Sequence, residues 1–407
     1  MLSAVYGVTN RLLRCVRHAE AGDRPALARE RAALLDGHVA MLRALCPAPR
    51  APQHEAYLHA TLSAALDGTC GDILGARAAS AHQRDFVSSA GERWATRLVL
   101  AHLADGLGRA AVACDAVDVI VTDGVAGDAK PLLRETRARC ASALAPHLAG
   151  GAIGLLTGFY GADAHGRLTT LGRGGSDLSA AVLGYCLDAQ EIQLYKVEHT
   201  GVSAGGSSGG GGWMQAWAPG WVGIAHCAQP DITIPSLHYE EARELAHFAK
   251  KVLHPDTVSP AVEKGIPILV RNSLQPELAG TRIVGGAAGG LGPRALTVTH
   301  VAVRNYEALQ GALGDALPVA ALGAECARES AHLVALVGLN VMALAGLAAR
   351  ARALLAAARL PFAVPQRVNG SPNNFTVLVR TEDKDAVMEL FHRELVMGGG
   401  GGGGGGA

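Results

Sequence analysis

Short apolar runs alternate with helix-like segments through the middle of this chain of 407 residues, and the alternation limits the folds open to it. The runs at 152–156, 191–195 and 266–270 read AIGLL, EIQLY and IPILV, and they predict strands. Between them, charged residues interleave with Leu and Ala at helical spacing, at about 129–148 and 239–251. This order predicts a layered α/β domain with a mainly parallel sheet and helices on both faces.

The N-terminal third is expected to be mostly helical. Residues 10–66 and 86–107 carry apolar residues at helical spacing among charged ones. The run DVIVT at 118–122 predicts a further strand, and a helix is expected at 176–187 after a loop at 157–175.

The pattern changes after about residue 285, where shorter strands and helices follow one another. This order predicts a small α+β sandwich of the ferredoxin-like kind. Strands are expected at 297–302, 332–339 and 373–379, and helices at 306–314, 345–359 and 383–395.

Two stretches are rich in glycine and low in complexity. Residues 205–212 read GGSSGGGG, and residues 398–406 are consecutive glycines. Such sequences behave as flexible coil and cannot bury a core. The first is expected to interrupt the α/β domain, and the second to form a tail.

The charge balance argues against several classes of partner. The chain has 36 basic and 36 acidic residues and only 4% aromatic residues, so we expect neither a nucleic acid nor a membrane as partner. The longest uncharged apolar run, 333–349, is at the lower limit for a membrane span. It contains Gly338, Asn340 and Gly346, which favour a strand, a turn and a helix start.

The spacing of cysteine and histidine predicts no metal site. Cys46 and Cys70, the nearest two of the eight cysteines, are 24 positions apart, and the 16 histidines form no HExxH motif. Wide cysteine spacing in a large chain is typical of reduced intracellular thiols. Residues 1–13 lack the charged and apolar regions of a signal peptide, so no targeting segment is visible.

The segment 157–181, TGFYGADAHGRLTTLGRGGSDLSAA, is the strongest candidate for a binding site. Gly174 and Gly175 allow backbone N–H groups to approach a ligand, and the helix that follows favours an anion there. Arg173 offers a planar fork for a carboxylate or phosphate, and Asp177 would attract a cationic group. Ser176 or Asp177 could cap this helix. The alternative is an ordinary Gly-rich loop before a helix.

Other candidates have plainer alternatives. Glu92 lies in the middle of a helix, where a carboxylate is usually solvated. Lys251 lies at a helix end, where it could serve the helix dipole or reach a nucleotide phosphate. The matches to G-x-S-x-G at 201–205 and 205–209 lie in the glycine stretch with no helix after them, which argues against a hydrolase.

Five segments resemble aspartate kinase, a family of the amino-acid kinase fold. The C-terminal stretches ALVGLNVMALAGLAAR and NGSPNNFTVLVRTEDKDAVMELFHREL resemble its ACT regulatory domain. The five segments are SAVYGVTNRLL at 3–13, SAGERWA at 89–95, LLTGFYG at 155–161, TTLGRGGSDLSAA at 169–181 and YEEARELAHFAKKVLHPDTVSPAVEKGIPILVRN at 239–272.

The resemblance implies an amino-acid kinase fold followed by an α+β ferredoxin-like ACT domain. The kinase domain would cover 1–285, lack its first strand and be interrupted by a Gly-rich insert near 203–225. An ACT region at 286–397, with a reduced first unit and a nearly complete second one, would bind an amino-acid effector and support a homodimer or larger assembly. Residues 398–407 would be a glycine tail.

The implied reaction transfers the γ-phosphoryl group of ATP to the β-carboxylate of L-aspartate. The product is 4-phospho-L-aspartate, the first intermediate towards lysine, threonine and methionine. Mg²⁺ would be held mainly by the ATP phosphates, with no dedicated protein ligands. By motif match, Arg173 would hold the aspartate α-carboxylate, and Glu92 would hold its ammonium group. Asp177 and Lys251 would be catalytic, and Lys251 would also contact the nucleotide. The residues expected beside the substrate are Ser3, Thr9 and Ser176, and those expected beside the nucleotide are Gly174 and Gly175.

The sequence departs from the family pattern at two places in the kinase region. The K-F-G-G-T-S strand that precedes SAVYGVTNRLL in the family is not among these residues, so we expect this chain to make little acyl phosphate. The adenine-side segment is degraded at 195–201, YKVEHTG. The alternatives are a catalytically impaired paralogue or regulatory subunit that keeps the fold, or a kinase of another amino acid. The family is plastidic in plants and cytoplasmic in bacteria.

Overall fold

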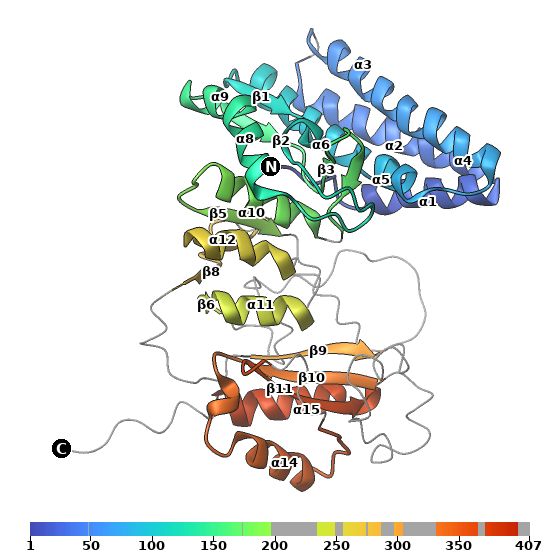
Figure 1. The fold of residues 1–407 in the computed structure, drawn as a ribbon. Coiled ribbons are helices and arrows are strands. Elements are labelled where there is room, and N and C mark those ends of the chain that lie inside the picture. Colours follow the sequence, from blue (N-terminus) through green and yellow to red (C-terminus); the bar gives the residue numbers. More distant parts are fainter. Residues whose placement is uncertain are drawn as a thin grey trace. The chain divides into compact units, whose positions relative to one another are not determined.

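The computed structural model divides the chain into two compact units (Figure 1). Unit 1 comprises Met1–Gln190 and Ser259–Lys264, and unit 2 comprises Glu191–Val258 and Gly265–Ala407. The structure describes residues 1–47, 49–172, 174–196, 234–248, 255–273, 276–285, 297–303, 331–364 and 371–397.

Helices dominate the first hundred residues of unit 1, as the sequence predicts. Their apolar faces form one core, in which Leu12, Leu42, Leu58 and Trp94 are buried. The predicted helix at 86–107 is divided at Ser89. The helices are α1 (Val8–Ala21), α2 (Arg24–Leu45), α3 (Ala51–Leu62), α4 (Cys70–Ala76), α5 (Ala81–Ser88) and α6 (Ala90–Leu100), with π-helical turns η1 (Ser63–Thr69) and η2 (Ala101–Gly106).

A parallel pair of strands, β1 (Ala111–Cys114) and β2 (Ile153–Leu156), belongs to the α/β part of unit 1. The prediction of a strand at 118–122 is wrong, because Asp115 caps a short helix, α7 (Ala116–Val119), by accepting from the N–H of Val117. Three further helices and a small antiparallel pair complete this part. They are α8 (Leu133–Ala143), α9 (Ala145–Ala149), α10 (Gly175–Cys186), β3 (Tyr160–Ala162) and β4 (Leu168–Thr170).

Unit 2 contains a mixed four-stranded sheet and a three-stranded antiparallel sheet. The first has the order β5-β7-β8-β6, with β5 and β7 parallel, and the second has the order β11-β10-β9. The strands are β5 (Ile192–Lys196), β6 (Ser236–His238), β7 (Ile268–Asn272), β8 (Thr281–Val284), β9 (Thr297–Val303), β10 (Ala331–Val337) and β11 (Asn374–Arg380). The helices are α11 (Tyr239–Phe248), α14 (Leu347–Ala357) and α15 (Lys384–Phe391), and α12 (Val258–Lys264) begins in this unit and continues in unit 1.

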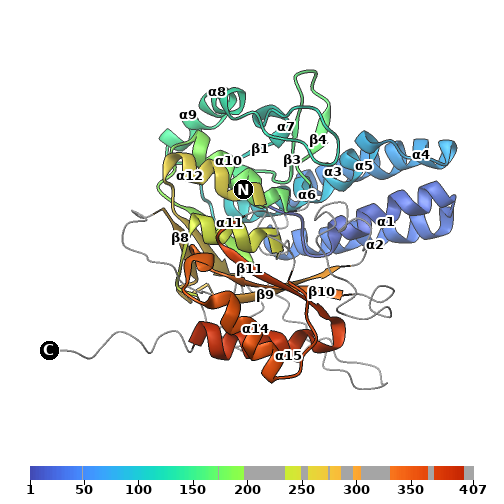
Figure 2. The same ribbon diagram turned by 60° about the horizontal axis from the view of Figure 1, so that its bottom comes forward.

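Helices α14 and α15 cover the same face of the three-stranded sheet (Figure 2). Leu355 of α14 and Phe391 of α15 pack with Val334 and Val377 in one buried cluster. The three strands predicted for this region correspond to β9, β10 and β11, and the helices predicted at 345–359 and 383–395 correspond to α14 and α15. The predicted helix at 306–314, the glycine stretch at 205–212 and the glycine tail lie outside them.

The apolar run at 333–349 forms a strand, a turn and a helix start, as predicted. Asn340 has a φ of 46°, and Gly346, with a φ of 70°, is the N-cap of α14. Among the helices of the described residues, none has both the length and the apolar composition needed to cross a membrane.

Two buried carboxylates of α11 bind the ends of β10 and β11 within unit 2. Glu241 accepts a hydrogen bond of 3.0 Å from the N–H of Leu339. Glu244 accepts bonds of 2.7 Å from the Ser371 hydroxyl and 2.6 Å from the Asn374 amide. Helix α11, which follows β6 of the four-stranded sheet, is therefore joined to the three-stranded sheet by polar bonds.

Replacement of Glu244 with alanine is expected to lower the free energy of unfolding by roughly 2–4 kcal/mol, because it removes the carboxylate that accepts from the half-buried Ser371 hydroxyl and the buried Asn374 amide. Urea unfolding measures the change. Glu240→Ala, on the same helix with its side chain 43% exposed, is the control and should change little. Equal effects of the two substitutions would contradict this account.

Candidate functional site

The N-terminal residues run beside the end of β2. The N–H of Leu2 donates to the carbonyl of Leu156 at 2.9 Å, and the N–H of Gly158 donates back to Leu2 at 2.9 Å. This pairing is parallel. It brings Ser3 and Ala4 to the carboxyl edge of the strands, where parallel α/β sheets bind their ligands.

Close backbone packing at Gly158 requires glycine. A Cβ atom there would lie 2.3 Å from Sδ of Met1, 3.0 Å from the carbonyl oxygen of Leu2 and 3.1 Å from Oγ of Ser176. Three segments thus meet around one backbone position, and Ser176 is one of the residues that the sequence assigned to the site.

Glu92 of α6 is buried, with 3% of its surface exposed, so the alternative of a solvated helix residue is wrong. Its Oε1 accepts a bond of 3.2 Å from the N–H of Ala4, whereas Oε2 is buried without a hydrogen-bond partner. Burial raises the pKa of Glu92 to about 8, and the Ala4 N–H offsets only part of this effect. An unpartnered buried carboxylate oxygen of this kind is suited to binding a cationic group.

The glycines of the loop before α10 have backbone conformations that other residues rarely adopt. Gly172 has a φ of 77°, and Gly174, the N-cap of α10, has a φ of 76°. A Cβ atom at Gly175 would lie 2.9 Å from Cβ of Leu171. The loop therefore holds the first N–H groups of α10 without a side-chain cap.

Ser176 and Asp177 lie inside the first turn of α10, so the prediction that one of them caps the helix is wrong. Asp177 is buried, and its N–H donates to the carbonyl of Gly174 at 2.9 Å. A carboxylate in the first turn is favourable to the helix dipole.

The remaining predicted residues are divided between described and undescribed parts of the chain. Ser3 is exposed next to Ala4, and Thr9 is half-buried in the first turn of α1. Arg173 and Lys251 lie outside the described residues, so their roles stay predictions.

Asp85 is a buried carboxylate that sequence reasoning missed, and its hydrogen bonds support the loop before α10. It accepts bonds of 2.8 Å from both the N–H and the hydroxyl of Thr170, and of 2.9 Å from the N–H of Gly127. Asp85 is 42 positions from Gly127 and 85 positions from Thr170 in the sequence, so no local pattern signals this arrangement.

Phe159 has a φ of 77°, which is uncommon for a residue with a side chain. Its N–H donates to Oγ of Ser179 at 3.0 Å, and this hydroxyl donates to the carbonyl of Gly175 at 2.9 Å. Ser179 thus fixes a strained backbone position to the start of α10, and strain of this kind is often found at functional sites.

A charged network supports α6 and β3 beside the site. Arg93 donates to Asp115 at 2.8 Å, and the hydroxyl of Tyr160 donates to the same carboxylate at 2.9 Å. The Arg93 guanidinium also lies 5.2 Å from the centre of the Tyr160 ring and 5.5 Å from that of Phe86. This network orients the helix that carries Glu92.

Comparison with known proteins finds two kinds of similarity. The model of the amino acid kinase family matches residues 40–200. The chain is also similar to aspartokinases. It is 36% identical over 203 residues to aspartokinase 3, chloroplastic, of Arabidopsis thaliana, and 34% identical over 169 residues to lysine-sensitive aspartokinase 3 of Escherichia coli.

These matches cover 49% and 42% of this chain, and the chain spans about a third of the length of each relative, 33% in both cases. The crystal structure of E. coli aspartokinase III in complex with aspartate and ADP shares the fold. Its TM-score is 0.73 at 22% sequence identity, over 97% of this chain and 92% of that chain. The amino-acid kinase fold predicted from the sequence is confirmed.

Proposed function

We propose that this protein is an aspartate kinase, which transfers the γ-phosphoryl group of ATP to the β-carboxylate of L-aspartate. The observation that carries the proposal is Glu92, whose buried Oε2 has no partner. An α-ammonium group would pair with this oxygen and favour the charged form of the carboxylate.

The loop before α10 supplies the complementary site for anions. It leaves the N-terminus of α10 without a side-chain cap, and the positive end of the helix dipole favours a carboxylate or phosphate there. Arg173, placed by sequence between Gly172 and Gly174, adds a guanidinium for the substrate α-carboxylate. Lys251 supplies a positive charge for the nucleotide.

The chemistry requires positioning more than proton transfer. The β-carboxylate is already an anion at neutral pH, so the nucleophile needs no general base. The difficulty is to bring it to a triphosphate of the same charge, which Mg²⁺ on the phosphates and the cationic side chains would reduce. Asp177 is the carboxylate that α10 offers near this region.

The C-terminal part is proposed to be regulatory. The three-stranded sheet with α14 and α15 supports an ACT-type region within 286–397, after a kinase domain at 1–285. An amino-acid effector would bind there, and thermal-shift titration of the whole protein with lysine, threonine and S-adenosylmethionine tests this. A homodimer or larger assembly formed through this region remains part of the proposal.

Ligand binding is the primary test, because weak turnover by this chain stays a prediction. Calorimetric titration with L-aspartate should show one site, and succinate, which lacks the ammonium group, should bind far more weakly. Equal affinities for the two ligands would contradict the assignment of Glu92.

Phosphoryl transfer is tested by trapping the product with hydroxylamine in the presence of ATP, Mg²⁺ and L-aspartate. Aspartyl hydroxamate would support the kinase, whereas aspartate binding without any hydroxamate would contradict catalysis and favour a binding protein of the same fold. Arg173→Ala is expected to raise the KM for aspartate at least tenfold more than the KM for ATP, since it removes one charge-assisted bond pair. An unchanged aspartate dependence would refute that role.

A further inference from the structure

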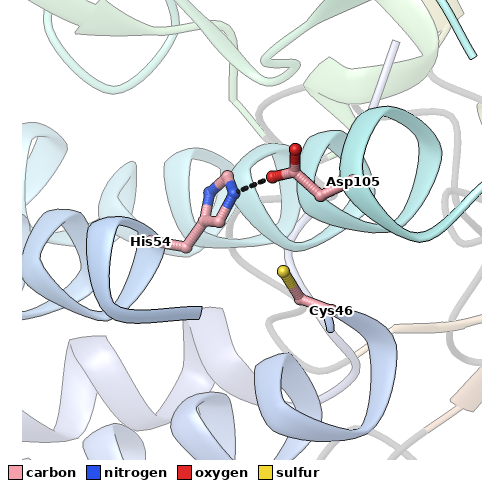
Figure 3. A group of neighbouring side chains, drawn as sticks. All are labelled: Cys46, His54 and Asp105. Atoms are coloured by element: carbon pink, nitrogen blue, oxygen red, sulfur yellow. Dashed lines mark hydrogen bonds and ion pairs between the residues drawn. The ribbon is translucent and has the colours of Figure 1, made fainter. Parts of the chain in front are cut away.

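Three side chains with metal-binding atoms meet in the helical part of unit 1, apart from the residues of the proposed kinase site. They are Cys46, at the end of α2, His54, in the first turns of α3, and Asp105, in η2. One ligand atom from each lies within 4.8 Å of the other two (Figure 3). Their wide separation in sequence explains why motif spacing predicted no metal site.

Local structure builds this convergence. The N–H of Cys46 closes the last turn of α2 by donating to Leu42 at 2.9 Å, and α3 begins after a short connection. The π-helical turn η2 approaches the same end of α2, where a Cβ atom at Gly106 would lie 2.9 Å from the Leu45 carbonyl oxygen. Turns of this kind are often found at functional sites.

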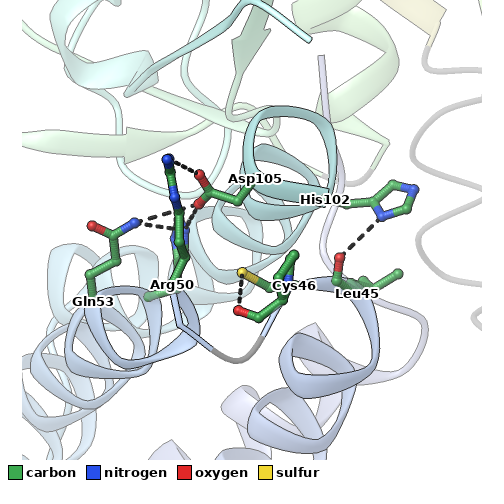
Figure 4. A network of polar contacts seen from close by, with 8 residues as sticks. Leu45, Cys46, Arg50, Gln53, His102 and Asp105 are labelled. Atoms are coloured by element: carbon green, nitrogen blue, oxygen red, sulfur yellow. Dashed lines mark hydrogen bonds and ion pairs between the residues drawn. The ribbon is translucent and has the colours of Figure 1, made fainter. Parts of the chain in front are cut away.

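The close approach of η2 is reinforced beside the cluster. A ring nitrogen of His102 lies 3.3 Å from the same Leu45 carbonyl oxygen (Figure 4). The end of α2 and the turn η2 are therefore fixed next to each other by backbone as well as side-chain contacts.

The three side chains are shielded from solvent. Cys46 and His54 are 5% and 3% exposed, and the Asp105 side chain is 6% exposed. Nε2 of His54 lies 2.6 Å from Oδ2 of Asp105, whereas the other ring nitrogen is buried without a partner.

Arg50 covers the cluster from the solvent side. Its guanidinium donates to Oδ1 of Asp105 at 2.8 Å, although its side chain is 66% exposed. An exposed arginine of this kind can rotate into solvent at little cost. This rotation of Arg50 would leave the Asp105 carboxylate open to another cation.

We propose that Cys46, His54 and Asp105 form a binding site for one divalent cation of the zinc type, with Arg50 as a counter-ion that the metal displaces. Sulfur, imidazole nitrogen and carboxylate oxygen together suit Zn²⁺ or Co²⁺ and do not suit Mg²⁺ or Ca²⁺, which prefer oxygen alone. Water would supply the fourth ligand.

Binding requires small local changes. Tetrahedral zinc bonds of about 2.0–2.3 Å place ligand atoms about 3.3–3.8 Å apart, so His54 and Asp105 must separate by about 0.7–1.2 Å from their 2.6 Å contact. Ligand atoms up to 4.8 Å apart must approach by about 1 Å. The thiol of Cys46 releases its proton to solvent, and the proton on His54 moves from Nε2 to Nδ1. The bound ion would join the end of α2, α3 and η2.

Equilibrium dialysis of the whole protein with Zn²⁺ alone tests the proposal. One ion per chain is expected, and Cys46→Ser, His54→Gln and Asp105→Asn should each weaken the affinity at least tenfold. Cys114→Ser and His59→Gln are matched controls that should retain it, because Cys114 lies outside the cluster and His59 is an exposed residue of α3 outside it. No binding, or binding unchanged by Cys46→Ser, would overturn the proposal.

Two readouts separate a metal site from a merely structural network. Co²⁺ should give a thiolate charge-transfer absorption band that Cys46→Ser removes and Cys114→Ser retains. Arg50→Ala should raise the Zn²⁺ affinity about two- to fivefold, since it removes the competing charge of an exposed pair. Lower affinity in Arg50→Ala, or a Co²⁺ spectrum without the thiolate band, would overturn the assignment.

Discussion

Replacement of Glu92 with glutamine is expected to stabilise the protein at pH 8 and to remove most of its affinity for L-aspartate. The amide keeps an acceptor for the Ala4 N–H but carries no charge that must be buried. Loss of one partner of a buried ion pair costs about 3–5 kcal/mol, so aspartate should bind at least about a hundredfold more weakly.

The sign of the stability change follows from the raised pKa. The pKa of the carboxyl group has its ordinary value of 4.5 in the unfolded chain and is about 8 in the folded one. Its stabilising contribution is full below pH 4.5 and is lost as the pH rises towards 8. The variant should therefore match the wild type at low pH and exceed it at pH 8, by at most about 5 kcal/mol.

Thermal unfolding across this pH range measures the stability change, with Glu135→Gln on the exposed face of α8 as the control. Calorimetry adds a second readout. The aspartate affinity of the wild type should rise between pH 6 and 8 as Glu92 loses its proton, by up to about tenfold per pH unit, and the variant should lack this dependence. A variant less stable than the wild type at pH 8 would contradict the account.

Replacement of Asp85 with alanine is expected to release the loop before α10. Three donors, from Gly127 and Thr170, would lose their buried acceptor, which predicts a loss of roughly 3–5 kcal/mol in the free energy of unfolding. Because Thr170 lies at the end of β4 and leads into the loop, ligand affinity should also fall.

Urea unfolding and calorimetry with L-aspartate measure the two effects of Asp85→Ala. Asp72→Ala, at an exposed position of α4, serves as the control. Asp85→Asn keeps an acceptor oxygen and should lie between the wild type and alanine in both measurements. If alanine at position 85 left both quantities unchanged, the supporting contacts of Asp85 would not hold the loop.

The sequence predicted the elements whose signals are local. Helical periodicity located α10 and α11, and short apolar runs located β2, β5 and β7. The failure at 118–122 is instructive, because apolar residues there satisfy a strand pattern while the Asp115 cap favours a helical turn.

The residues of the candidate site could likewise be predicted only where their signal is local. A contiguous motif identified Gly174, Gly175 and Asp177, whereas Asp85 acts through partners that are distant in the chain. Burial of Glu92 also escaped prediction, since its environment depends on how the N-terminal segment packs at the end of β2. Long-range packing of this kind leaves no periodic signal.

The half-buried thiol of Cys114 offers a built-in place for a spectroscopic reporter. It is the one cysteine of the described residues that is not fully buried, and its carbonyl accepts from the N–H of Thr157, at the edge where Gly158 meets the N-terminal segment. Burial and the charge of Asp118 raise the pKa of this thiol, so mildly alkaline conditions would favour its alkylation. With Cys227 and Cys326 changed to serine, a fluorophore attached to Cys114 would report ligand binding as a change in fluorescence.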